Sequence, residues 1–159
     1  MRYLIILLFL AYPHAAVSCE VAGTIEGSWN DVYIVQSDNC SNTIMTFNIY
    51  GNDNKLSSHQ NSNKTSYVEI DGDSNNINVT QSGTGYHNLD LQVVGDGHTI
   101  GVQQTDNGNK TATIELTNLG GAWNFNLNQT GPMGHNFDMN AANGACYTSG
   151  GCNLTVTQQ

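Results

Sequence analysis

The sequence has very few basic residues and little charge of either sign. Its 159 residues include 4 Lys and Arg against 13 Asp and Glu, and charged residues make up 11% of the chain. An ordinary soluble domain carries about 25%. The formal net charge of −9 argues against a nucleic-acid partner, because phosphate contacts require clustered Lys and Arg. The same deficit disfavours docking onto an anionic membrane surface.

Helix-forming patterns are also missing. No segment after residue 18 sustains the 3.6-residue apolar period of an amphipathic helix. In place of charge the chain carries amides and hydroxyls, with 22 Asn, 9 Gln and 15 Thr beside 17 Gly and only 2 Pro. Glycine and asparagine at this frequency destabilise helices. The composition therefore favours an all-β fold.

One continuous apolar run stands at the N-terminus. Arg2 precedes an apolar stretch at residues 3–11, and the tripeptide Ala-Val-Ser at residues 16–18 has the small-x-small pattern of a cleavage site. The stretch is too short to span a bilayer. We therefore predict that residues 1–18 are a signal peptide, called the leader below. The mature chain would then start at Cys19 and be secreted to the cell surface or beyond.

The chain has 4 cysteines, and export places them where disulfides form. Cys146 and Cys152 are six residues apart and can close a small loop, which leaves Cys19 and Cys40 as the natural second pair. An alternative is that Cys19 is lipidated, because the tripeptide before it also resembles a lipobox.

Glutamine recurs at an almost constant spacing, with separations of 24, 21, 23, 25 and 29 residues. A glycine stands nine residues before each of the first five, and a serine before the sixth. The glutamines are Gln36, Gln60, Gln81, Gln104, Gln129 and Gln158, and the glycines are Gly27, Gly51, Gly72, Gly95 and Gly120. A fixed period of this kind indicates one supersecondary unit repeated along the chain.

Two apolar positions recur between each glycine and its glutamine, so that the unit reads G-x4-φ-x-φ-x-Q, where φ is apolar. A spacing of two places both apolar side chains and the glutamine on one face of a strand. The apolar residues are Val32, Ile34, Leu56, Ile77, Val79, Ile100, Val102, Phe125, Leu127, Leu154 and Val156, with Ser58 as the one exception. These positions form the predicted core of the repeat.

A second apolar strand follows each glutamine after a turn rich in glycine, asparagine and serine. Each unit is thus strand-turn-strand-turn and about 23 residues long, and it can bury its apolar faces only by stacking on its neighbours. We predict a two-sided β-solenoid of about five and a half coils after a short N-terminal segment at residues 19–26. The units are 27–50, 51–71, 72–94, 95–119, 120–148 and 149–159.

Stacked coils place like residues over one another, about 4.8 Å apart. We predict that the six glutamines form a ladder in which each side-chain amide donates to the next side-chain carbonyl, as in cross-β assemblies. Stacking also explains the scarcity of charge, because like charges in one column repel. No helix is expected to cap either end, and open edges favour head-to-tail addition of identical molecules into a filament.

The repeat resembles the curlin repeats of curli, the secreted bacterial amyloid fimbriae. Residues 74–83, with the pattern φ-x-φ-x-Q-x-G at their end, carry the likeness most clearly, and Gln129-Thr130-Gly131 is similar. The resemblance covers roughly residues 27–159. It implies an extracellular fibre subunit, exported through a dedicated outer-membrane pore, that assembles with itself or a related subunit for adhesion and biofilm matrix.

Catalytic motifs are absent. The sequence contains no H-E-x-x-H, G-x-S-x-G or P-loop pattern, and its acidic residues are scattered. We therefore expect no enzymatic activity, cofactor, small-molecule substrate or metal site. Four histidines follow the leader, His59, His87, His98 and His135. His87 and His135 share the position just before the second strand but lie two coils apart, too far for one metal ion, and we predict that these two are solvated turn residues.

Two alternatives involve binding. Asp71, Asp73 and Asp96 lie at glycine-rich corners, where a weak calcium site is conceivable, although ordinary turn chemistry explains them as well. Flat solenoid faces bearing Thr-x-Thr can order water, and residues 111–113 and 155–157 match that pattern. The alternative function is therefore a soluble secreted solenoid that binds ice, polysaccharide or another surface.

Overall fold

The computed structural model describes residues 4–9, 19–37, 41–61, 63–117, 121–140 and 151–159. These residues contain thirteen β-strands and no helix. The strands are β1 (Leu4–Phe9), β2 (Cys19–Glu26), β3 (Asp31–Gln36), β4 (Thr43–Tyr50), β5 (Lys55–Gln60), β6 (Lys64–Asp71), β7 (Asn76–Gln81), β8 (His87–Leu89), β9 (Thr99–Gln104), β10 (Lys110–Glu115), β11 (Trp123–Gln129), β12 (His135–Asn140) and β13 (Cys152–Gln158).

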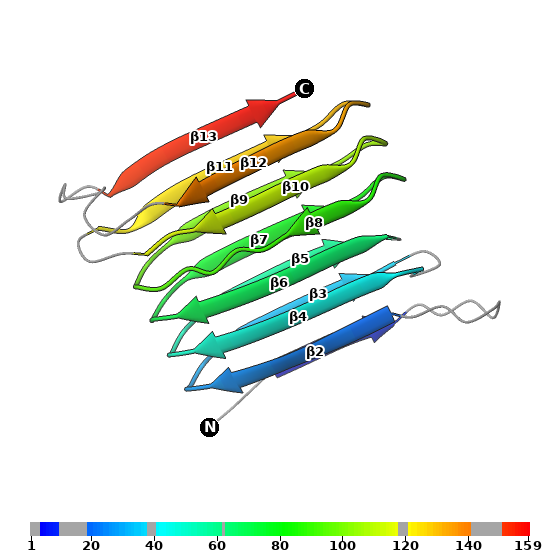
Figure 1. Ribbon diagram of the computed structural model, residues 1–159. Coiled ribbons are helices and arrows are strands. Elements are labelled where there is room, and N and C mark those ends of the chain that lie inside the picture. The colour runs from blue at the N-terminus through cyan, green and yellow to red at the C-terminus, as the bar shows by residue number, and fades with distance from the viewer. Residues whose placement is uncertain (1–3, 10–18, 38–40, 62, 118–120, 141–150) are drawn as a thin grey trace.

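The strands form two parallel sheets that face each other. Sheet A has the order β1-β3-β5-β7-β9-β11-β13, and sheet B has the order β12-β10-β8-β6-β4-β2. From β2 onward the chain alternates between the sheets, so that each coil adds one strand to each (Figure 1). The predicted all-β solenoid is confirmed.

Neighbouring strands pair in the register that the repeat predicts. Gln60 lies opposite Gln36 on one side and Gln81 on the other, and the same phase continues through β9, β11 and β13. A shift by one residue would turn every apolar side chain of a strand outward. The periodic apolar pattern therefore fixes the register, and the register places equivalent residues in continuous columns.

The core lies between the inner faces of the two sheets. All the predicted first-strand core residues from Val32 to Leu127 are buried there, and so are the apolar second-strand residues from Met45 to Leu116, whereas Phe137 and Met139 of β12 are only partly buried. The final strand is different, because Leu154 keeps 36% of its surface exposed and Val156 is only partly buried. Both residues stand in core register with β11, but no further strand covers them among the described residues.

The N-terminal segment at residues 19–26, predicted to precede the repeats, is a full strand. It is β2, and it pairs with β4 over its whole length. Val21 and Ile25 pack against the core, and Gly23 between them lies under the ring of Phe47, whose nearest atom is 2.3 Å from where a Cβ on Gly23 would stand. Because Gly23 has no side chain, it breaks the alternation of apolar residues by which the sequence would have indicated this strand. β2 adds half a coil to the five and a half coils predicted from the sequence.

The leader also contains a strand, although the sequence predicts it to lie outside the fold. β1 pairs in parallel with β3, and Phe9 stands opposite Gln36 at the end of the register. Six consecutive apolar residues make a strong strand former, and β3 otherwise offers an unpaired edge. Cleavage after Ser18 remains a prediction.

Glycine is required at the corners that lead into β3, β5 and β7. Gly27, Gly51 and Gly72 have φ of 126°, 120° and 143°, a region that residues with a Cβ rarely adopt. A Cβ on Gly72 would stand 2.0 Å from the carbonyl oxygen of Gly95 in the next coil. The repeated glycine therefore permits the close stacking of corners.

We predict that Gly72→Ala lowers the free energy of unfolding by about 3 kcal/mol, because it combines backbone strain with a clash against a backbone oxygen. The matched control is Gly97→Ala at the equivalent corner of the next coil. Gly97 also has positive φ, but its nearest neighbour would be the Cβ of Ala122 at 3.6 Å. The control should cost about 1 kcal/mol, the left-handed backbone term alone. Urea unfolding of the two variants measures the difference, and equal losses would refute the carbonyl clash.

Candidate functional site: the stacked side-chain columns

The six predicted glutamines form one hydrogen-bonded column. The Nε2 of each of the first five donates to the Oε1 of the glutamine in the next coil. The distances are 3.2 Å from Gln36 to Gln60, 2.8 Å from Gln60 to Gln81, 2.8 Å from Gln81 to Gln104, 2.8 Å from Gln104 to Gln129, and 2.7 Å from Gln129 to Gln158. The first five side chains are buried.

The second amide hydrogen of most of these glutamines reaches the opposite sheet. Gln81 Nε2 donates to Thr65 O at 3.3 Å, Gln104 Nε2 to Asn88 O at 3.1 Å, and Gln158 Nε2 to Asn136 O at 3.2 Å. The ladder thus ties sheet A to sheet B as well as coil to coil. Such paired amides avoid the cost of a buried unsatisfied polar group, about 1–3 kcal/mol each.

The ladder has a direction, since the side-chain amides of the first five glutamines all donate toward the C-terminal coil. Its two ends are therefore chemically different. At the N-terminal end, Gln36 Oε1 is buried and has no hydrogen-bond partner among the described residues. At the C-terminal end, Gln158 is only partly buried and lies on the last strand of sheet A.

A second buried column lies at the glycine corner, three residues after each glycine. Its members are Asn30, Asn54, Asn75 and His98. Asn54 N donates to Asn30 Oδ1 at 2.9 Å, and Asn54 Nδ2 donates to Gly72 O at 2.8 Å. Asn75 repeats the same pair of bonds one coil further. The sequence contains a signal for this column, because each of these asparagines stands three residues after a repeat glycine. That spacing was overlooked because the chain has 22 asparagines.

The third column is cationic and lies at the other corner, just after the glutamine. Lys64, His87, Lys110 and His135 follow one another in register on sheet B. Lys64 and Lys110 are 0% and 1% exposed. Lys110 Nζ donates to Gly108 O at 3.0 Å, Gly131 O at 2.8 Å and Met133 O at 2.9 Å. Lys64 Nζ donates to Gly83 O at 3.0 Å and Gly85 O at 2.6 Å. Each ammonium therefore binds turn carbonyls.

The prediction of a solvated turn residue is wrong for His87, which is fully buried, and His98 is fully buried as well. His87 Nε2 is 2.7 Å from Ser82 O, and His98 Nε2 is 3.2 Å from Val94 O. Burial, with the Lys64 charge nearby, lowers the pKa of His87 to about 4. Burial also lowers the pKa of His98 and of Lys110. A neutral His87 between two lysines keeps like charges two coils apart.

We predict that acid destabilises the fold through His87. Its pKa is 6.5 when unfolded and about 4 when folded, so the unfolded chain binds the proton more readily. Neutral His87 therefore contributes to the free energy of unfolding, on the order of 3 kcal/mol. This stabilisation is fully present above pH 6.5 and is lost as the pH falls to 4. Chemical unfolding at several pH values should show a flatter slope for His87→Gln than for the native chain. The exposed-site control, His59→Gln, should keep the native slope; identical slopes in all three would contradict the assignment.

The remaining predicted site residues are distributed as follows. Gly120 lies outside the described residues, as do Cys40 and Cys146, so neither predicted cysteine pairing is described in full. Cys19 and Cys152 are each disulfide-bonded. Their strands, β2 and β13, are five coils apart on different sheets, too far for a bond to each other.

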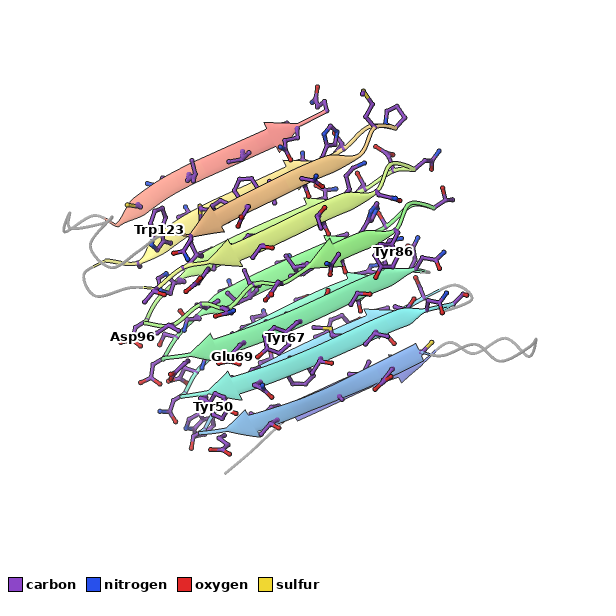
Figure 2. All side chains as sticks on the ribbon, in the orientation of Figure 1. Tyr50, Tyr67, Glu69, Tyr86, Asp96 and Trp123 are labelled. Atoms are coloured by element: carbon purple, nitrogen blue, oxygen red, sulfur yellow. The ribbon has the colours of Figure 1, made fainter. Side chains whose placement is uncertain are left out.

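The corner aspartates make turn contacts. Asp73 Oδ1 accepts from Asn52 N at 2.6 Å, and Asp96 Oδ1 accepts from Asp73 N at 2.7 Å. Asp96 lies at the glycine corner in Figure 2.

Among the described residues no three His, Cys, Asp or Glu side chains gather in a way that could hold a metal ion. No described helix is long and apolar enough to cross a membrane.

The two outer faces of the solenoid differ in charge. Sheet B and the ends of its strands carry most of the acids: Glu20, Glu26, Glu69, Asp71, Asp90, Glu115 and Asp138. Tyr67 donates a hydrogen bond to Glu69 on this face, where Figure 2 places both side chains. Burial, with the Glu69 carboxylate nearby, raises the pKa of Asp90.

Sheet A is different from β7 to β13, where every outward residue is an amide, a hydroxyl or glycine. Gly101 leaves a shallow depression of about 460 Å³ between Asn78, Asn126 and Thr155. The two predicted Thr-x-Thr segments do not share a face, because residues 111–113 lie on β10 of sheet B and residues 155–157 on β13 of sheet A.

Comparison with protein-family models, with curated proteins and with solved structures finds no match to this chain. The fold itself defines the class, an all-β solenoid of two parallel sheets. Its distinguishing features are the columns of glutamine, asparagine and lysine-histidine that run along the stack.

Proposed function

We propose that this chain is a secreted structural subunit that assembles with copies of itself, end to end, into amyloid-type surface fibres for adhesion and biofilm matrix. The observation that carries the proposal is the glutamine ladder, which runs from Gln36 to Gln158 with an unpartnered acceptor at one end. A column of this kind gains a hydrogen bond with each coil added. Assembly extends the pattern already present within one molecule.

The ends of the sheets support the same function. Sheet B ends at β2 and β12, and sheet A ends at β13, with no further described strand beyond them. Exposed edges of this length template the addition of further strands. The likeness of the units to curlin repeats supports an extracellular fibre and a dedicated export pore as its route out of the cell.

A second candidate is a soluble solenoid that binds a polysaccharide or an ice surface through sheet A. The depression at Gly101 and the uncharged outer face from β7 to β13 favour it. The described lining of that depression contains no aromatic or charged side chain, so it offers hydrogen bonds and little else. We therefore place the fibre function first.

The decisive experiment follows fibre formation after removal of the leader. The purified full chain, with a protease site at residues 15–18, is cleaved and held at tens of micromolar. We expect a lag, then thioflavin-binding fibres with cross-β diffraction, and we expect seeds to remove the lag. A chain that stays monomeric for days, reduced and oxidised, would refute the proposal. Thermal hysteresis or polysaccharide binding without fibres would support the second candidate.

A further inference from the structure

We propose that β13 of one molecule docks on β3 of the next, in the place that β1 occupies in the uncleaved chain. The ladder then continues from Gln158 to the next molecule's Gln36. This inference rests on the proposed assembly function, and it specifies the two surfaces that meet, their register and their polarity. It also assigns the leader a second role, as the strand that occupies the docking edge.

The hydrogen-bond pattern sets the polarity. Gln36 is 1% exposed, and its Oε1 has no partner among the described residues. Within the molecule each such oxygen receives an amide from the preceding coil, as Gln60 does from Gln36 at 3.2 Å. The residue opposite Gln36 on β1 is Phe9, and phenylalanine carries no hydrogen-bond donor. A glutamine in that position, such as Gln158, supplies the missing bond.

The backbone register supports the same junction. β1 shows that the β3 edge accepts a parallel strand of six residues, Leu4–Phe9 against Asp31–Gln36. β13 has no described strand on its outer side, and it lies in the phase of the repeat, since Leu154 pairs with Phe125 and Gln158 with Gln129. Extended by one coil, this phase places Leu154 opposite Val32 and Gln158 opposite Gln36. The half-exposed Leu154 then becomes core.

Sheet B continues in step. The last coil of one molecule ends in β12 and β13, and the first coil of the next begins with β2 and β3, so both sheets pair at once. Sheet B register places Met139 of one molecule beside Gly23 of the next, because both lie in the column of Phe47.

Charge does not oppose the junction. The acidic residues on the two strands of the first coil are Glu20 and Glu26 on sheet B and Asp31 on sheet A. In the continued register Glu20 stands opposite Asn136 and Asp31 opposite Asn153, both neutral amides, and the register of Glu26 runs past the described end of β12. The acidic Asp138 stands opposite Ala22. Among the described residues no like charges lie directly across from each other at this junction, although the full chain carries a net charge of −9.

Cysteine cross-linking tests the junction directly. Tyr33 and Thr155 point outward and occupy equivalent positions of β3 and β13, so the junction brings their Cα atoms to about 4.8 Å, within the range of a disulfide. Two singly substituted full chains, Tyr33→Cys and Thr155→Cys, are cleaved at the inserted protease site, mixed and allowed to assemble. We expect reducible dimers only in the mixture. The control mixture replaces Tyr33→Cys with Ser57→Cys, one coil inside the molecule, and should give none.

The outcomes separate the junction from the function. Fibres that form without the Tyr33–Thr155 link, or with dimers of Thr155→Cys alone, overturn the junction and leave the fibre function standing. A chain that forms no fibres overturns both. Both substitutions replace exposed side chains, and thioflavin assays of each variant alone check that it still assembles.

Two further measurements test the ladder and the leader. Gln158→Met removes the donor, and we expect fibre growth to slow about tenfold, whereas Gln159→Met, one residue further and exposed, should leave it unchanged.

The uncleaved chain should neither assemble nor be recruited by seeds until the protease is added. Equal growth before and after cleavage would show that β1 does not hold the docking edge.

Discussion

Gln104→Lys is expected to lose about 4 kcal/mol or more of folding free energy. Gln104 is fully buried, accepts from Gln81 at 2.8 Å and donates to Gln129 at 2.8 Å. A lysine there still donates, but it cannot accept from Gln81, and its charge is buried with no counter-ion placed to pair with it. Fibre assembly of this variant should slow strongly, because the damaged column is the one that assembly extends.

The neighbouring residue supplies the control. Gln103 is exposed on the outer face of sheet A, so Gln103→Lys adds the same charge to the same strand without entering the column. Its effect on stability should stay within about 0.5 kcal/mol. Urea unfolding measured by circular dichroism compares the two variants. If both lose the same free energy, charge on the sheet matters and the ladder does not.

A third variant separates the hydrogen bonds from the charge. Gln104→Met keeps the length of the side chain and leaves Gln81 without its acceptor and Gln129 without its donor. We expect an intermediate loss of about 1–3 kcal/mol, the cost of unsatisfied buried amides. A loss as large as that of Gln104→Lys would assign the whole effect to the ladder.

Spacing alone was enough to predict the coils and the glutamine ladder. Alternation marks the inward face of a strand, and an identical residue at a near-constant interval marks a column, so Gln81 and Val79 could be placed without any structure. Sheet pairing in register follows, because any other register would expose the apolar face. The predictions were therefore firmest where one physical requirement repeats in every coil.

The buried lysines could not be predicted in this way. Lys64 and Lys110 stand in phase with the inward residues of β6 and β10, but a charged residue at the start of a strand is ordinarily exposed. Their burial depends on carbonyls from turns whose geometry the sequence does not reveal. His87 was misjudged for the same reason. β2 was missed because Gly23 interrupts its alternation, and the space it leaves is occupied by the ring of Phe47.

The buried lysines and His87 share a cause, which lies at the corners of the coil. A tight turn directs several carbonyl groups inward, away from water, and each requires a donor. Asparagine supplies it at one corner, where Asn54 Nδ2 binds Gly72 O. Lysine and histidine supply it at the other. The asparagine column and the lysine-histidine column therefore donate hydrogen bonds to the backbone carbonyls of the turns, whereas the glutamines of the ladder donate to one another.

The same argument predicts the second large effect, for Lys110→Met. The Lys110 ammonium donates to three carbonyls from two successive turns, those of Gly108, Gly131 and Met133, at 2.8–3.0 Å. Replacing a buried charge with an apolar residue is often neutral, because the desolvation cost of the charge disappears as well. Here the partners are backbone groups that remain in place and lose their donor.

We therefore expect the loss of the three hydrogen bonds to outweigh the gain from no longer burying the ammonium. Lys110→Met should destabilise the fold by about 3 kcal/mol. Lys55, the exposed first residue of β5, provides the control, and Lys55→Met should change stability by less than about 0.5 kcal/mol. Urea unfolding gives both values, and hydrogen exchange at the amides of the turns at 105–109 and 130–134 locates the damage. Lys110→Met as stable as the native chain would mean that desolvation of the ammonium cancels its three hydrogen bonds. Faster exchange confined to those two turns would instead identify Lys110 as the donor that joins one coil to the next.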